Sequence, residues 1–122
     1  YSNKVNAGFP SPADDHIEGK LDLNTHLIKH PSATFFVKAT GDSMIGAGIH
    51  EGDILVVDRS LEARSGKVVI AAVDGNLTVK RLKRSGKDIL LSPENNNYKP
   101  IKLTENNDVV IWGVVTNVIH KV

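Results

Sequence analysis

The residue best suited to do chemistry in this sequence is Ser43, in the stretch KATGDSMIGAGIHEGD at residues 38–53. Glycines and aspartates surround it, which is typical of a tight loop, and a serine there usually serves as a turn hydroxyl. The alternative is a nucleophile, which requires a base within hydrogen-bond reach to remove the hydroxyl proton. Other residues of the chain must therefore decide what Ser43 does.

Lys80 is the candidate for that base. In NLTVKRL, residues 76–82, strand alternation places Lys80 and Leu82 on the same face. If Leu82 is buried, desolvation on this partly apolar face disfavours the ammonium and lowers the pKa of Lys80. A neutral lysine amine can take a proton from a serine hydroxyl, which is the Ser–Lys form of nucleophile activation. The other interpretation is an exposed Lys80 whose flexible stem carries the amine to water.

The histidines predict neither a metal site nor a catalytic triad. His26 and His30 are four residues apart, but the glutamate and third ligand of a helical zinc motif are absent. The other three histidines are scattered along the chain: His16, His50 and His120. We therefore expect surface histidines, no metal ligands and no cofactor.

The composition fits one small domain of 122 residues. Fifteen Lys and Arg against fourteen Asp and Glu leave a net charge of +1, which argues against extensive direct binding to DNA. The basic cluster at residues 80–84 reads as a solvated strand end. The absence of cysteine excludes disulfides and a Cys nucleophile. No apolar run reaches the roughly 18–20 residues that span a bilayer, so we expect no membrane association and a cytoplasmic location.

Residues 1–20 predict an extended, flexible arm, because two prolines and two glycines interrupt any regular pattern. A short helix is expected within residues 21–32, ending at His30 because Pro31 disfavours helical geometry before it.

The rest of the chain predicts short strands. The expected strand segments are 34–40, 53–58, 67–83 as a hairpin turning at Asp74-Gly75, 87–93 and 108–120. The longest apolar run, residues 109–115, reads as a buried strand. Together these segments predict a mostly β fold, a small distorted β-sandwich or barrel over residues 21–122 preceded by the arm.

Four motifs carry a resemblance to a known family. In chain order they are Gly8-Phe9-Pro10-Ser11-Pro12, His30-Pro31-Ser32-Ala33-Thr34, Gly41-Asp42-Ser43-Met44 and Thr78-Val79-Lys80. With these motifs the chain, from about Ala7 onward, resembles the LexA/UmuD family of self-cleaving Ser–Lys peptidases, peptidase family S24. The resemblance implies a β-rich fold, a homodimer, and a dyad that cuts the protein's own N-terminal arm.

The resemblance also implies a role for each matching residue. Ser43 is expected to be the nucleophile and Lys80 the general base, with the scissile bond between Ala7 and Gly8. Backbone N–H groups of Ser43 and Asp42 are expected to hold the oxyanion. Ala7 needs only a small pocket, and Gly8 lets the backbone approach the nucleophile closely.

Two functions in this family remain open. The arm sequence and the His30–Thr34 motif favour a UmuD-like SOS-response protein. In that case a RecA–single-stranded DNA filament stimulates the cut, and the product serves a UmuC-like translesion polymerase as an accessory subunit. The Ala-Gly pair is instead typical of LexA-like repressors, in which a helix-turn-helix domain would precede Ala7 and could not fit in seven residues. A signal-peptidase-like protease acting on other proteins is disfavoured by the missing membrane anchor.

The expected homodimer is predicted to form through the C-terminal apolar run, around Ile111, Trp112 and Val114. A strand that is apolar on both faces needs cover on both, and a domain of this size does not easily supply it alone.

Overall fold

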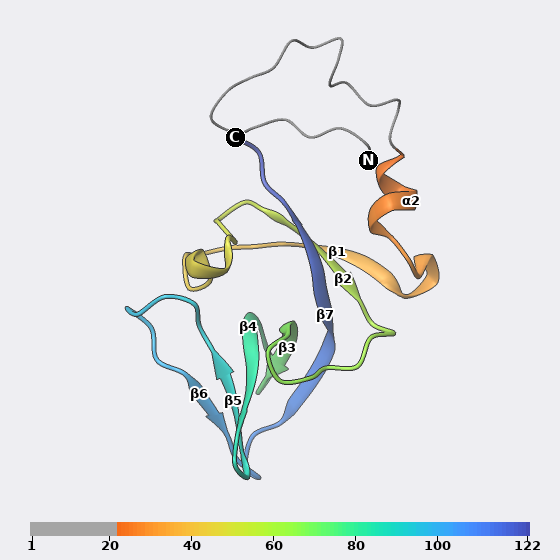
Figure 1. Ribbon diagram of the computed structural model, residues 1–122. Coiled ribbons are helices and arrows are strands. Elements are labelled where there is room, and N and C mark those ends of the chain that lie inside the picture. The colour runs from red at the N-terminus through yellow and green to blue at the C-terminus, as the bar shows by residue number, and fades with distance from the viewer. Residues whose placement is uncertain (1–21) are drawn as a thin grey trace.

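A computed structural model describes residues 22–122 of the chain (Figure 1). The predicted arm, including Ala7 and Gly8, lies outside the described residues. Asp22 starts the described part by capping a short helix, α2 (Leu23–Leu27), its carboxylate accepting a hydrogen bond from the N–H of Asn24 at 3.0 Å. The strands and two 3₁₀ turns follow.

The described residues form one seven-stranded antiparallel sheet, so the expected mostly β class is confirmed. The strand order is β1-β2-β7-β3-β4-β5-β6. The strands are β1 (Thr34–Lys38), β2 (Ile54–Asp58), β3 (Val68–Val73), β4 (Asn76–Ser85), β5 (Asp88–Ser92), β6 (Ile101–Leu103) and β7 (Val109–Ile119). The 3₁₀ turns are η1 (Pro31–Ala33) and η2 (Ile45–Ala47).

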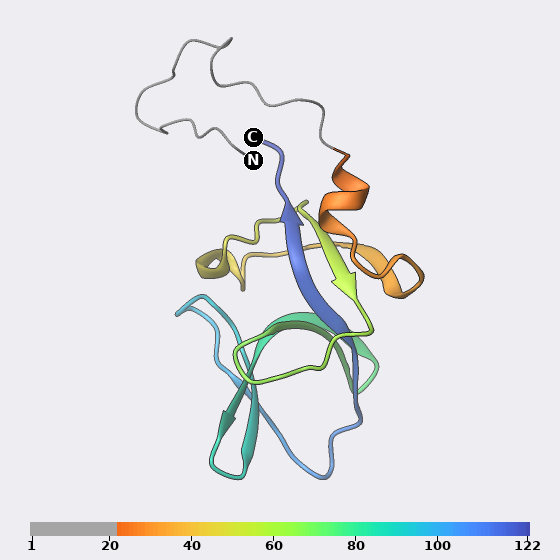
Figure 2. The same cartoon turned by 45° about the vertical axis from the view of Figure 1, so that its right-hand side comes forward.

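Strand β7 lies between β2 and β3 and so connects the two parts of this sheet. Its second half pairs with β2 and its first half with β3, so that Val114 lies opposite both Asp58 and Val69. The register skips Trp112 on the β3 side and Thr116 on the β2 side. Such extra residues bend a strand and increase its twist. Figures 1 and 2 show the result: β7 runs the length of the domain, with β1 and β2 beside one end and β3 to β6 around the other.

The bent sheet encloses two groups of buried apolar side chains. The first lies under β1, β2 and the loop between them: Ala39, Met44, Ile49, Leu55, Val57 and Ile70. The second lies between β3, β5 and β7: Val69, Ala71, Leu91 and Val114. Because β3 contributes alternate residues to both groups, it fixes one half of the sheet against the other.

Gly113 marks the closest approach of β7 to β2. A Cβ atom there would lie 2.7 Å from Cγ1 of Val57 and 3.0 Å from the backbone oxygen of Asp58. We therefore expect Gly113→Ala to lower the free energy of unfolding by about 1–3 kcal/mol, because the added methyl overpacks a tight contact. Urea denaturation would measure this, with Val110→Thr, an exposed change on the same strand, as control. Equal unfolding midpoints for the two variants would contradict the prediction.

The tight hairpin is confirmed. Strands β3 and β4 pair from Val73↔Asn76 outward, and the turn residues Asp74 and Gly75 both have positive φ, 50° and 85°. Two central residues with positive φ define the type I′ turn that suits a twisted hairpin.

Two local predictions differ from the structure. The helix ends at Leu27, not at His30, because Ile28 is already extended and Pro31 begins a separate 3₁₀ turn. The short strand β6 (Ile101–Leu103) was not predicted, because three residues carry little alternation to recognise.

The prediction of a fully buried strand at residues 109–115 is wrong in its middle. Val110, Ile111 and Trp112 are 53%, 37% and 41% exposed. Val114, in contrast, is buried in the second core group. It therefore has no surface to offer a partner, and the predicted dimer contact at Val114 is excluded in this fold.

No helix formed by residues 22–122 is long and apolar enough to cross a bilayer.

Candidate active site

Ser43 sits on the loop that joins β1 to β2. The next residue, Met44, is 2% exposed and packs into the first core group, which anchors the loop beside the serine. The backbone oxygen of Ser43 accepts a hydrogen bond from the N–H of Glu94 at 2.8 Å. The backbone oxygen of Asp42 accepts one from the side-chain amide of Asn95 at 2.9 Å. The segment after β5 therefore holds the serine loop in place.

Gly46 makes a close backbone contact between these two segments. Its N–H donates to the backbone oxygen of Glu94 at 2.7 Å, and a Cβ atom would lie 2.7 Å from that same oxygen. We expect Gly46→Ala to slow any reaction at Ser43 about 10–100-fold, because the loop must shift and small misplacements of reacting groups are costly. Cleavage rates, with circular dichroism to confirm folding, would measure this. An unchanged rate in a folded variant would contradict it.

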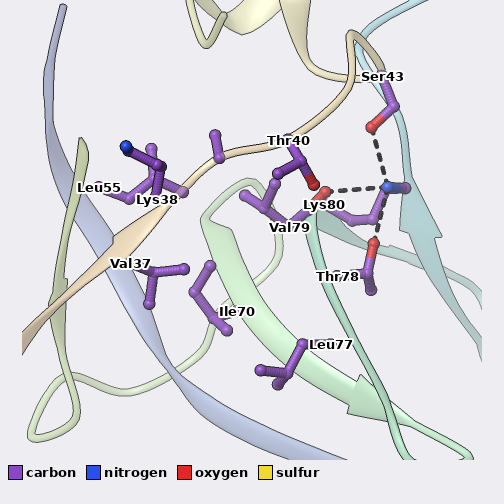
Figure 3. Close-up of a pocket in the computed structure, with 11 residues that line it drawn as sticks. Val37, Lys38, Thr40, Ser43, Leu55, Ile70, Leu77, Thr78, Val79 and Lys80 are labelled. Carbon is purple, nitrogen blue, oxygen red and sulfur yellow. Dashed lines mark hydrogen bonds between the residues drawn. The ribbon is translucent and has the colours of Figure 1, made fainter. Parts of the chain in front are cut away.

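Lys80, on β4, reaches the Ser43 hydroxyl (Figure 3). Its Nζ donates to Oγ of Ser43 at 3.0 Å, to Oγ1 of Thr78 at 2.8 Å and to the backbone oxygen of Val79 at 3.1 Å. The two side chains are 37 residues apart in sequence, and the fold brings them into direct contact.

Burial lowers the pKa of Lys80. Desolvation penalises the charged ammonium, and among residues 22–122 no carboxylate pairs with it to offset that penalty. The carboxylate of Glu94 is instead held by Arg81, whose Nε lies 2.6 Å from Oε1. A shift of this direction increases the fraction of neutral amine at a given pH.

The three contacts of Lys80 suit a neutral amine as well as an ammonium. An ammonium has three N–H donors, one for each acceptor. A neutral amine keeps two N–H donors, which the oxygens of Thr78 and Val79 can accept. Its lone pair then faces Oγ of Ser43 and can accept the hydroxyl proton. The arrangement can therefore generate a serine alkoxide-like nucleophile without moving the lysine.

The backbone beside Ser43 offers donors for a negative charge. Within the described part of the chain, no hydrogen bond uses the N–H of Asp42 or of Ser43. Their carbonyl oxygens, in contrast, are both occupied. Paired N–H groups of this kind can stabilise an oxyanion. The hydroxyl of Tyr98 donates to the side chain of Asp42, which raises the pKa of Tyr98 and further fixes the loop.

A cavity of about 230 Å³ opens next to the dyad. Buried apolar side chains form part of its lining, including Leu55 and Ile70. Two strand segments with one unpaired edge also line it: β1, which pairs only with β2, and the first half of β4, which pairs with β5 only from Arg81 onward. An extended peptide can pair with such edges.

The sequence matches the family model described as Peptidase S24-like over residues 1–116. The chain belongs to the peptidase S24 family. The family recognised from the four sequence motifs is therefore confirmed.

The chain is also similar to three curated relatives. SamA of Salmonella typhimurium is 47% identical over 121 residues, covering 99% of this chain and 84% of SamA. ImpA of Escherichia coli is 45% identical over 125 residues, covering 99% and 82%. MucA of Escherichia coli is 42% identical over 118 residues, covering 96% and 80%.

In this S24 domain the predicted basic cluster at residues 80–84 is not uniformly solvated. Lys80 is half-buried against Ser43, and Arg81 pairs with Glu94 and donates to the backbone oxygen of Gly66 at 2.6 Å. Only the last two basic residues, Lys83 and Arg84, are exposed. The first two basic side chains have structural partners because β4 carries them toward the serine loop and the segment after β5.

The four histidines within residues 22–122 are at the surface, as predicted, but they are not all isolated, and His16 lies outside the described residues. Nδ1 of His30 lies 2.6 Å from the buried carboxylate of Asp58. His50 and His120, predicted to be scattered, lie beside each other with ring centroids 4.7 Å apart.

Sequence reasoning missed the residues that support the S24 site. Thr78 accepts from Lys80, and Asn95 and Tyr98 hold Asp42. Thr78 lies within a recognised motif, and its spacing from Lys80 was the available signal. Asn95 and Tyr98 lie in a stretch, ENNNY, that reads only as a loop.

Proposed function

We propose that this S24 protein cleaves itself between Ala7 and Gly8, with Ser43 as nucleophile and Lys80 as general base. The observation that carries the proposal is the 3.0 Å contact between Nζ of Lys80 and Oγ of Ser43, at a desolvated amine beside a cavity. No other residue type in this arrangement is needed for acyl transfer.

The proposed cleavage proceeds through an acyl-enzyme on Ser43. The lone pair of Lys80 takes the Ser43 hydroxyl proton as Oγ attacks the carbonyl carbon of Ala7. The N–H groups of Asp42 and Ser43 hold the resulting oxyanion. The intermediate collapses as Lys80 returns its proton to the nitrogen of Gly8, which leaves as a new N-terminus. Lys80 then deprotonates a water molecule that attacks the ester carbonyl carbon. Lys80 returns this proton to Oγ of Ser43, which leaves as the hydroxyl, and Ala7 is released with a new C-terminal carboxylate.

In this proposal the arm docks in the cavity beside Ser43. An extended segment around Ala7 can pair with the unpaired edges of β1 and β4 on either side of the cavity. Val37 and Ile70 give the cavity apolar lining, shown in Figure 3, that would suit the methyl group of Ala7. Gly8 follows at the point where the backbone must pass closest to Ser43.

We further propose that the cleaved form is an accessory subunit of an error-prone, UmuC-like translesion polymerase in the SOS response. Support comes from the relatives: the match covers 80–84% of the length of MucA, ImpA and SamA, so this one domain makes up most of each. That is the expected organisation of an accessory subunit. A LexA-like repressor needs a separate DNA-binding domain instead.

In this proposal a RecA–single-stranded DNA filament favours the state in which the arm is docked. A docked arm excludes water from Lys80 and so raises the fraction of neutral amine. RecA then contributes no catalytic group.

The protein is proposed to act as a homodimer through the exposed apolar residues of β7, Val110, Ile111 and Trp112. The ring of Trp112 packs edge-on against Phe35, with centroids 6.3 Å apart, which keeps it presented at the surface. A monomeric mass by light scattering at micromolar concentration would contradict the dimer.

The experiment for the proposed function mixes purified protein with RecA, single-stranded DNA and a non-hydrolysable ATP analogue. The expected result is conversion to a fragment that begins at Gly8. That fragment, and not the intact protein, should then be retained by an immobilised UmuC-like polymerase. Cleavage that releases a sequence-specific operator DNA, with no retention by the polymerase, would favour the repressor function and contradict this one.

A further inference from the structure

A cluster of three potential metal ligands lies outside the proposed catalytic machinery. Asp53 directly precedes β2 and is 3% exposed, and His120 directly follows β7. Nδ1 of His120 lies 2.6 Å from Oδ1 of Asp53, and Nδ1 of His50 lies 3.7 Å from Oδ2. One potential ligand atom from each residue lies within 4.8 Å of the other two.

The His50 ring distinguishes this cluster from an ordinary His–Asp pair. Asp58 and His30 form such a pair at the same 2.6 Å separation, and there the N–H and hydroxyl of Ser60 complete the carboxylate. At Asp53 the backbone N–H of His50 donates to Oδ2 at 2.8 Å, and the imidazole of the same residue approaches that oxygen where Asp58 has the Ser60 hydroxyl. Among residues 22–122, no hydrogen bond uses the ring of His50, although its Nδ1 lies only 3.7 Å from the buried carboxylate of Asp53.

From this arrangement we propose that His50, Asp53 and His120 bind a divalent transition-metal ion of the Zn²⁺ class. Two imidazoles and one carboxylate are donors that Zn²⁺ accepts, whereas Mg²⁺ prefers oxygen ligands. The remaining coordination position goes to water. Both histidine side chains are close to half exposed, 49% and 44%, so an ion can reach them from solvent.

Binding one ion requires local adjustment of the three side chains. Two tetrahedral zinc ligands at about 2.0–2.2 Å from the metal lie about 3.3–3.6 Å from each other. Nδ1 of His50 is already near this separation from Oδ2 of Asp53, at 3.7 Å. Nδ1 of His120 and the other oxygen, Oδ1, must move apart by about 0.7–1.0 Å from 2.6 Å, as the metal replaces the proton between them. His120 lies beyond the last paired residue of β7, Ile119, and can make this movement. The ligand atoms of the two histidines lie within 4.8 Å of each other.

The position of the cluster gives a bound ion a structural consequence. The backbone oxygen of Asp53 accepts from the N–H of Ala39, and Gly52 donates back to Ala39, both at 2.8 Å. These bonds close the base of the loop that carries Ser43. An ion at Asp53 would therefore tie the end of β7 to that base, which lies beside it in both views of the chain (Figures 1 and 2).

The test is a titration of the untagged, metal-free full chain with zinc chloride by isothermal calorimetry. We expect one Zn²⁺ per chain with a micromolar or lower Kd, and a rise in Tm of at least about 5 °C in saturating Zn²⁺ but not in Mg²⁺. The double variant His50→Ala, His120→Ala should weaken binding at least about 100-fold, because only one ligand is left. Both side chains are exposed, so folding should persist.

His30→Ala is the matched control, since it removes one histidine from the comparable pair with Asp58. It should bind Zn²⁺ like the unaltered chain. Absence of binding at 100-fold higher Zn²⁺ than the protein would overturn the proposal. So would binding that the double variant retains, which would place the ion elsewhere. None of these readouts depends on cleavage, so the result is independent of the proposed function.

Discussion

Ser43→Ala and Lys80→Ala are each expected to abolish cleavage of the arm, with rates at least about 1,000-fold below that of the unaltered chain. Removing either member of a nucleophile–base pair costs about as much as removing both. The physical reason is the single 3.0 Å contact through which the proton must leave the hydroxyl. Gel analysis of incubations with an activated RecA filament would measure the rates.

Lys38→Ala provides the matched control. Lys38 lines the same cavity, but its amine lies on the other side of the cavity from Ser43 (Figure 3). The Lys38→Ala variant should cleave at least about 100-fold faster than the Lys80→Ala variant. All three variants should keep the circular dichroism spectrum of the unaltered chain. Normal cleavage by a folded Ser43→Ala or Lys80→Ala variant would show that the substituted residue is not required for cleavage.

The second large effect is the response of cleavage to pH. Burial lowers the pKa of Lys80 from its ordinary value of 10.5. Below the lowered pKa the amine is protonated and has no lone pair for the serine proton. The rate without RecA should therefore rise about tenfold per pH unit from pH 7 and level off below pH 10.5.

Lys80→Arg separates the charge of this residue from its titration. Arginine keeps the positive charge but stays protonated over the whole range, so it cannot serve as a base. This variant should show no cleavage above background at any pH, and the background rate should not rise with pH as it does in the unaltered chain. A flat profile for the unaltered chain, or an active arginine variant, would show that Lys80 is not the titrating base.

Much of the site follows from local sequence. Asp74-Gly75 fixes the β3–β4 hairpin, and the alternation along β4 places Lys80 on the same face as Leu82, which packs against the second core group. Partial burial of the lysine follows from that alternation. The partnership with Ser43 did not follow from spacing and rested on the resemblance to the family.

What could not be predicted depends on long-range register. The bulges at Trp112 and Thr116 determine which residues of β7 lie beside β2, and the local sequence does not predict these bulges. With that register, His120 arrives next to Asp53, 67 residues away. Without it, the two histidines of the cluster read as scattered.

The prediction that residues 109–115 are buried was wrong for a related reason. An apolar run of seven residues predicts cover on both faces, but β7 pairs with β3 over its first half while Val110, Ile111 and Trp112 stay exposed. Composition gives the hydrophobicity of a segment and not the extent of the sheet that covers it. In the proposed dimer, the partner protomer would cover these exposed apolar side chains.

In the proposed function this chain needs no other protein's catalytic groups to cut its own arm between Ala7 and Gly8. The most direct measurement is intact-mass spectrometry of the purified full chain during incubation at pH 9–10 without RecA. We expect one product whose first residue is Gly8, formed steadily and absent from the Ser43→Ala variant. An unchanged intact mass over this pH range, or a cut at another bond, would contradict it.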